Sequence, residues 1–310
     1  MLGYLEVMND SNQSLSVDAG GQRLDVYLAG AVPEVSRSHW KGLIQDAWVT
    51  VNGSTCKPNH TLKAGDKVCW SIPGEAATEP QPEDIPLDIL FEDETVLVLN
   101  KPPGLVVHPA VGNESGTLLN ALLFHDPVFL ALDRSGIVHR LDKDTSGVMV
   151  VTKSDASMAE LQRQFKARET KKEYLALVWG HPPPSGRIET LIGRHPVHRK
   201  KMAVLEEGGR EAVSNFQTLE QFSDVALVEV EIETGRTHQI RVHLSHLGHP
   251  VVGDTVYGRA RKNRLPLAPE RQMLHAAKLE FTHPSTGKRI SFNAPLFDDM
   301  FQLLELLRKS

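Results

Sequence analysis

The sequence predicts an α+β fold with a central, mixed and largely antiparallel β-sheet. Segments with strand patterns outnumber those with helical patterns, and the two do not alternate in the regular order of parallel-sheet folds. The clearest strand signal lies in residues 228–232, where Val228, Val230 and Ile232 alternate with acidic residues. A period of two is typical of a strand with one buried face.

Residues 21–73 are expected to form a small module of their own. Residues 22–28 are a candidate helix, and Ser36 is placed to cap a second helix with apolar residues at helical spacing. Residues 49–53 end in Asn-Gly, a strong hairpin signal, and residues 65–68 lead into a last strand. This order predicts a compact α/β module.

Two segments are expected to flank the module. Residues 1–20 would form an N-terminal extension, and residues 74–90 an acidic, proline-rich linker with few apolar side chains to bury. Residues 91–310 would then form a second, larger domain, which the length of the chain allows.

The larger domain contains further strand and helix signals. Residues 95–99 are an apolar strand candidate, and Asp155 is expected to cap a helix. A later helix would end at Gly248 and leave Arg241 outside its apolar stripe. That stripe consists of Ile240, Leu244 and Leu247.

The composition is that of an ordinary soluble globular protein. Of 310 residues, 40% are hydrophobic and 24% charged. No segment approaches the roughly 18 consecutive apolar residues of a membrane span, and the N-terminus shows no secretory signal. Cys56 and Cys69 show no metal-like clustering and are expected to be buried free thiols. A cytoplasmic protein without membrane contact is expected.

The distribution of charge permits a nucleic-acid partner. The net charge is −5, but eight of the 39 acidic residues lie in residues 74–94, which contain no Lys or Arg. The rest of the chain has 34 basic and 31 acidic residues, a net charge of +3. Charge therefore allows an RNA partner without identifying one.

Residues 139–147, His-Arg-Leu-Asp-Lys-Asp-Thr-Ser-Gly, are rich in ionisable side chains. Arg140, Asp142 and Lys143 stand between two apolar segments, where a scaffold can hold a carboxylate rigidly at a cleft. Taken alone, the motif also fits a salt-bridged turn between strands. A kinase loop is excluded, because Leu141 breaks the His-Arg-Asp order and the sequence has no Asp-Phe-Gly motif.

This motif and three others resemble, in the same order, those of the RluA-type pseudouridine synthases. The other three occupy residues 100–109, 172–176 and 233–243. The resemblance is closest to the RluD-like enzymes of large-subunit rRNA, through residues 84–89 and 194–196. The N-terminal module is similar to an S4-type RNA-binding domain, through its Arg-Leu-Asp opening and its Val-Asn-Gly hairpin.

The resemblance implies a pseudouridine synthase fold preceded by an S4-type domain. It also implies an isomerase that converts uridine to pseudouridine at specific sites of 23S rRNA, in ribosome biogenesis. Breaking the glycosidic bond, rotating the base and rejoining it through carbon involves no net redox change or group donation. Neither a cofactor nor a metal is therefore expected. The implied partner is rRNA or its precursor particle, and a monomer is expected.

The resemblance also assigns roles to individual residues. Asp142 would be the catalytic carboxylate, Arg241 its partner, and Tyr174 the ring that stacks on the target base. Whether Asp142 attacks the sugar or acts as a base stays open, and Arg140 would fill the gap left by a flipped nucleotide. Further substrate contacts are expected from His139, Lys101, Thr237, His238 and Gln239. RNA contacts of the N-terminal module are expected from Arg23, Arg37, Lys41 and Lys63.

Three alternatives remain. The same chemistry could act on another rRNA site or on tRNA, or the chain could be a catalytically silent RNA-binding assembly factor. A hydrolase using Asp142 and Asp144 is a third, although carboxylates two residues apart need not converge on one bond. A metal site is not expected, because the spacing of the histidines at 238, 243, 246 and 249 fits no zinc motif.

Overall fold

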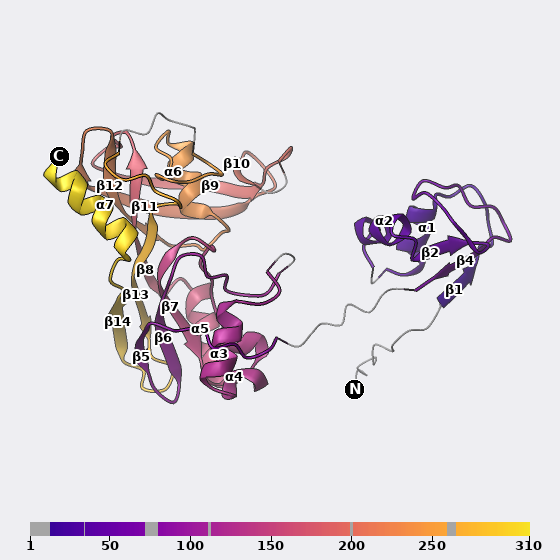
Figure 1. Cartoon of the computed structure of the whole chain (residues 1–310), viewed down its shortest axis with the longest axis horizontal. Helices are drawn as coiled ribbons and strands as arrows, with labels where there is room; N and C mark the ends of the chain where they lie inside the picture. Colours follow the sequence, from indigo (N-terminus) through magenta and orange to yellow (C-terminus); the bar gives the residue numbers. More distant parts are fainter. Residues whose placement is uncertain (1–12, 34, 72–79, 111–112, 199–200, 259–264) are drawn as a thin grey trace. The chain divides into compact units, whose positions relative to one another are not determined.

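The computed structural model describes residues 13–33, 35–71, 80–110, 113–198, 201–258 and 265–310. The chain forms two compact units, divided between residues 79 and 80 (Figure 1). Over the described ranges, no helix is long and apolar enough to cross a membrane.

The smaller unit is a four-stranded antiparallel sheet packed against two helices, with strand order β1-β4-β2-β3. Its elements are β1 (Gln13–Ser16), α1 (Leu24–Ala31), α2 (Arg37–Gln45), β2 (Val49–Val51), β3 (Ser54–Thr55) and β4 (Lys67–Trp70). Trp40 of α2 meets Trp70 of β4 edge to face, with 5.8 Å between ring centroids. The two rings belong to the hydrophobic core of this unit, which is separate from that of the larger unit.

The local signals in this unit are mostly confirmed. The Ser36 hydroxyl accepts the hydrogen bond that caps α2, and Asn52 and Gly53 form the hairpin turn with φ of 51° and 80°. The expected N-terminal extension, residues 1–20, is wrong for residues 13–16, because these form β1, which pairs with β4 in the sheet. Helix α1 begins at Leu24, two residues later than expected, and both cysteines are half-buried free thiols.

The larger unit is built on a ten-stranded sheet, with the path β10-β9-β11-β12-β8-β13-β7-β6-β5 and with β14 beside β13. Its strands are β5 (Ile89–Glu92), β6 (Val96–Lys101), β7 (Ser146–Thr152), β8 (Lys171–Trp179), β9 (Ser185–Arg194), β10 (Met202–Leu205), β11 (Arg210–Gln221), β12 (Val225–Ile232), β13 (Leu274–Thr282) and β14 (Arg289–Asn293). Among the described pairs only β7 and β13 run parallel. The α+β class with a mixed, largely antiparallel sheet is confirmed.

Helices cover this sheet in groups. They are α3 (Leu118–His125), α4 (Val128–Ala131), the 3-10 helix η1 (Asp133–Gly136), α5 (Asp155–Lys166), α6 (Gln239–His246) and α7 (Asp298–Lys309). In Figure 1, α3, α4 and α5 gather beside β6 and β7, and α6 lies by β9 and β11. Strands β6 and β7 are buried along their whole length. Because β7 begins at Ser146, the motif 139–147 ends in a rigid, buried strand.

Part of the expected linker belongs to the larger unit. The side chains of Ile85 and Leu87 pack against the main core, and the Glu83 carboxylate accepts a hydrogen bond from the Gly116 amide. A linker that continues to residue 90 is therefore wrong, and residues 74–79 lie outside the described ranges.

Two smaller expectations are also corrected. Helix α5 is capped by the hydroxyl of Ser154, one residue before Asp155. Leu247 lies just after α6 and is 38% exposed, so the buried stripe of that helix ends at Leu244. Gly248 follows with φ of 87°, as expected for the end of a helix.

Candidate active site

The motif loop, residues 139–145, connects η1 to β7 and is held through its backbone by two buried cations. Lys101 Nζ donates to the Lys143 carbonyl at 3.0 Å, and Arg271 Nη1 donates to the Asp144 carbonyl at 3.0 Å. The Thr145 amide donates to the Asp142 carbonyl at 3.1 Å, which closes the turn. The two residues that follow Asp142 are therefore held through their backbone carbonyls. The Asp142 side chain lines a cavity.

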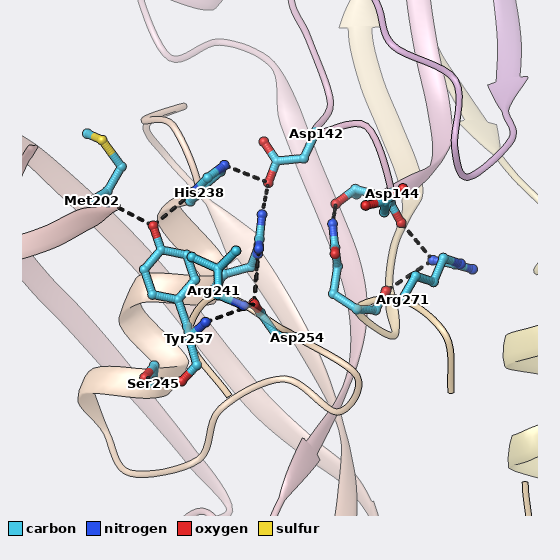
Figure 2. Close-up of polar contacts among 12 residues, drawn as sticks. Asp142, Asp144, Met202, His238, Arg241, Ser245, Asp254, Tyr257 and Arg271 are labelled. Atoms are coloured by element: carbon cyan, nitrogen blue, oxygen red, sulfur yellow. Dashed lines mark hydrogen bonds and ion pairs between the residues drawn. The ribbon is translucent and has the colours of Figure 1, made fainter. Parts of the chain in front are cut away.

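Asp142 is paired with Arg241, the partner that the family resemblance implies. Arg241 Nη1 of α6 donates to Asp142 Oδ2 at 2.9 Å, and the two side chains are 6% and 21% exposed, respectively. The rest of the guanidinium binds Asp254, with Nε to Oδ2 at 2.7 Å and Nη2 to Oδ1 at 3.0 Å. One arginine thus joins the candidate catalytic carboxylate to a fully buried second carboxylate (Figure 2).

The contacts fix the charges of Arg241 and Asp254. Burial alone would raise the pKa of Asp254, but hydrogen bonds from Arg241 and from the Val256 and Tyr257 amides hold that pKa below its usual value. Burial likewise opposes the charge on Arg241, and the two carboxylates outweigh it and raise its pKa. Arg241 is therefore a permanent cation, and its fork is already oriented before substrate arrives.

Sequence reasoning missed Asp254. Its only local signal is an acid that follows the apolar Val251-Val252 and a glycine. Gly253 has φ of 78°, and a Cβ there would lie 1.9 Å from the Arg271 carbonyl. Only glycine therefore brings the chain close enough for Asp254 to reach Arg241.

A cavity of about 110 Å³ opens beside Asp142. Tyr174 of β8, Arg140 and the start of α6 line it, as do Thr237 and His238. Burial, and the nearby Asp142, raise the pKa of Tyr174, so its phenol stays neutral at physiological pH. The cavity thus places a carboxylate, a neutral phenol and a ring face within one small space.

His238 is oriented by a residue that the sequence did not reveal. Its Nδ1 lies 2.8 Å from the Tyr257 hydroxyl, which also accepts a hydrogen bond from the Met202 amide at 2.8 Å. With Nδ1 held by this hydroxyl, the other ring nitrogen, Nε2, lies 3.8 Å from Asp142 Oδ2. Burial lowers the pKa of His238, which favours the neutral imidazole. Figure 2 shows the whole path from Met202 to Asp254.

The remaining expected substrate residues fall into two groups. Arg140 and Thr237 are exposed at the cavity, and Arg140 has no hydrogen bond to any residue of the described ranges. Gln239 is buried and bound to four protein groups, and His139 accepts the Val150 amide and stacks on a phenylalanine. The Gln239 and His139 side chains therefore bind other parts of the protein.

Lys101 has a different place from the one expected. It is fully buried, and its ammonium donates to the carbonyls of Pro102, Leu105 and Lys143. Burial, together with Arg271, lowers its pKa to about 7. All three donors are occupied, so Lys101 supports the motif loop and does not contact the cavity.

The basic residues expected to bind RNA in the smaller unit are partly organised by one acid. Arg23 and Arg37 both donate to the buried Asp25 carboxylate, at 2.9 Å and 3.0 Å, while their side chains stay 46% and 49% exposed. Lys41 and Lys63 are exposed on the same unit. Asp25 therefore holds two guanidinium groups together at the surface.

Comparisons with known proteins agree with this geometry. Residues 95–246 match the RNA pseudouridylate synthase family, and residues 22–68 match the S4 domain. Ribosomal large subunit pseudouridine synthase D of Pseudomonas aeruginosa is 46% identical over 94% of this chain and 94% of that protein. The protein of the same name from Neisseria meningitidis serogroup B is 44% identical over 98% of this chain and 83% of its own.

Two solved structures show the same fold over about three quarters of this chain. Human RNA Pseudouridylate Synthase Domain Containing 1 superposes with a TM-score of 0.56 at 29% identity, over 74% of this chain and 97% of that one. Human RNA Pseudouridylate Synthase Domain Containing 4 superposes with a TM-score of 0.53 at 27% identity, over 71% of this chain and 92% of that one. The expected S4 domain and enzyme class are confirmed, and this chain belongs to the RNA pseudouridylate synthase family.

Proposed function

We propose that this protein isomerises uridine to pseudouridine at specific positions of large-subunit (23S) rRNA. The observation that carries the proposal is the Asp142 carboxylate, held in a small cavity by Arg241 and faced by Tyr174. Support for the substrate comes from relatives at 44–46% identity whose names describe large-subunit enzymes. Exposed basic side chains on the S4 unit supply a second RNA contact.

In the proposed reaction the bond between uracil N1 and ribose C1′ breaks, and a bond between C5 and C1′ forms. Asp142 acts while ionised, either at the sugar carbon or as a base beside it. Arg241 keeps that charge in place through a bond that is present before substrate binds. C5 loses its proton and N1 gains one, so the product is an isomer of the substrate. The neutral Tyr174 phenol can stack on the base during its rotation.

Reaching the uridine requires its extrusion from a folded RNA, which costs a few kcal/mol. Arg140 is the proposed residue that fills the vacated space, because it is exposed at the cavity mouth and has no hydrogen bond to the described part of the protein. His238 and Thr237 are the proposed contacts to the extruded nucleotide. The S4 unit, through Arg23, Arg37, Lys41 and Lys63, is proposed to hold flanking RNA, and the enzyme to act as a monomer in the cytoplasm.

The test begins with a strain that lacks the gene. Pseudouridine mapping of total RNA should show the loss of one or a few sites, all in 23S rRNA. Restoring the gene should restore them, and restoring the Asp142→Asn variant should not, since an amide cannot supply the charge. Loss of sites only in tRNA or another rRNA would contradict the proposed substrate. Release of free uracil by the purified protein would indicate hydrolysis.

A further inference from the structure

Lys172 has a largely buried side chain whose ammonium has no partner. The residue lies on β8 and is only 8% exposed, yet its ammonium makes no hydrogen bond or ion pair with any residue of the described ranges. Its one close contact is with the ring of Phe165, whose centroid is 5.7 Å from Nζ. An ammonium has three donors, and Nζ is not among the described buried atoms that lack a partner, so these donors are open to the cavity that Lys172 lines.

Two other lysines show what a satisfied side chain looks like in this protein. Lys101 is fully buried, and its three donors all meet backbone carbonyls. Lys171, the neighbour of Lys172, points to the opposite face of β8 and pairs with Glu173 and Glu231. Lys172 has neither kind of partner, so its position is not explained by the stability of the fold.

The free ammonium faces a second cavity of about 430 Å³. Arg140 and Tyr174 line this cavity and the catalytic one, so the two adjoin. Because Lys172 and Tyr174 are two residues apart on one strand, both side chains leave the same face of the sheet. Whatever binds at Lys172 therefore lies next to the nucleotide at Asp142.

The charges around this second cavity favour an anion. Arg168 and Arg236 line it, and both are already engaged, Arg168 with Glu211 at 2.6 Å and Arg236 with the Glu211 carbonyl at 2.8 Å. Glu233 also lines it, but it is bound by Arg187. Burial, together with Arg168, lowers the pKa of Lys172 to about 8, as expected for a cation that lacks its counter-ion.

We propose that Lys172 binds a backbone phosphate of the RNA, immediately beside the target uridine. This inference rests on the proposed function, since it requires an RNA in the catalytic cavity. A phosphodiester offers the acceptors and the negative charge that Lys172 lacks, and Arg140 and Arg236 lie around the same space. The contact would fix the sugar while the base is free to rotate.

The test pairs a protein variant with a matched change in the RNA. Lys172→Met removes the charge with little change of shape, and Lys171→Met removes one charge from the same strand on the other face. The RNA is a hairpin that the wild type converts, made with a neutral methylphosphonate at each phosphate in turn around the uridine. We expect Lys172→Met to weaken Kd about 10- to 100-fold, the usual range for a bond between charged groups, and Lys171→Met to change it less than about threefold.

One methylphosphonate position should weaken binding of the wild type and of Lys171→Met, and have no further effect on Lys172→Met. If every methylphosphonate weakens binding of Lys172→Met as much as it weakens binding of the wild type, the phosphate contact is overturned. Equal RNA affinities of Lys172→Met and Lys171→Met would overturn it as well. Thermal unfolding separates a structural role. Lys172→Met should melt at or above the wild-type temperature, because no hydrogen bond or ion pair of the ammonium within the described ranges is lost, whereas a clear loss of stability would assign Lys172 to the fold. A wild type that converts no RNA would instead contradict the proposed function.

Discussion

Replacing Arg241 by methionine should separate the structural role of this arginine from its catalytic one. The guanidinium joins Asp142 to Asp254, and the Asp254 side chain is fully buried. In Arg241→Met, the Asp254 carboxylate keeps, among the described residues, the hydrogen bonds from the Val256 and Tyr257 amides. Removing one partner of a buried ion pair typically costs about 3–5 kcal/mol, so the larger unit should lose about that much free energy of unfolding.

The loss should depend on pH. In the wild type the pKa of Asp254 is below its unfolded value, so this group stabilises the fold above the unfolded pKa, and that stability is lost as the pH falls through the folded pKa. Without Arg241, burial remains and would raise the folded pKa of Asp254 above the unfolded value. The variant should therefore be weakest near neutral pH, and its deficit should shrink as the solution is acidified.

Catalysis should respond differently from stability. Asp254→Asn in the Arg241→Met background removes the buried unpaired charge and should recover part of the free energy of unfolding. It should not recover turnover, because Asp142 still lacks its cation, and single-turnover rates should stay about 10- to 100-fold below wild type in both variants.

Urea unfolding followed by circular dichroism measures the first effect, since three of the four tryptophans belong to the smaller unit and would dominate fluorescence. Unchanged stability of Arg241→Met would refute the buried-charge argument. Full recovery of turnover in the double variant would show that Arg241 acts only on the fold.

Three further expectations follow from the same side chains and units. Arg140→Ala should be partly rescued, in single-turnover rate, by an RNA hairpin whose uridine is already unpaired, and Arg241→Met should not; equal rescue would rule out a role for Arg140 in extrusion. Tyr257→Phe should lower turnover more than RNA affinity, because His238 Nδ1 loses its hydrogen-bond partner, and rates equal to wild type would show that this orientation is not used. Deleting residues 1–79 should leave a folded larger unit whose RNA affinity depends less on salt, with a slope smaller by about 0.9 for each duplex phosphate that the S4 unit no longer binds; an unchanged slope would assign the S4 unit another task.

Much of the local structure could be predicted from the sequence because it depends on neighbours in the chain. The Ser36 cap, the Asn52-Gly53 turn and the alternation in β12 each require only a few adjacent residues. The order of four motifs indicated the family, and the pairing of Asp142 with Arg241 was expected from that resemblance and not from spacing. These features could be predicted without knowledge of how the chain packs.

The tertiary structure decided how the site is supported. Asp254, Tyr257 and Arg271 have no periodic pattern, and Arg271 meets the Asp144 carbonyl across 127 residues of sequence. Likewise, nothing local distinguishes the buried and fully bonded Lys101 from the buried and unpartnered Lys172, since each follows an ordinary strand pattern. The difference lies in which groups from distant strands and loops come within hydrogen-bond distance, and only the folded arrangement of the sheet determines that.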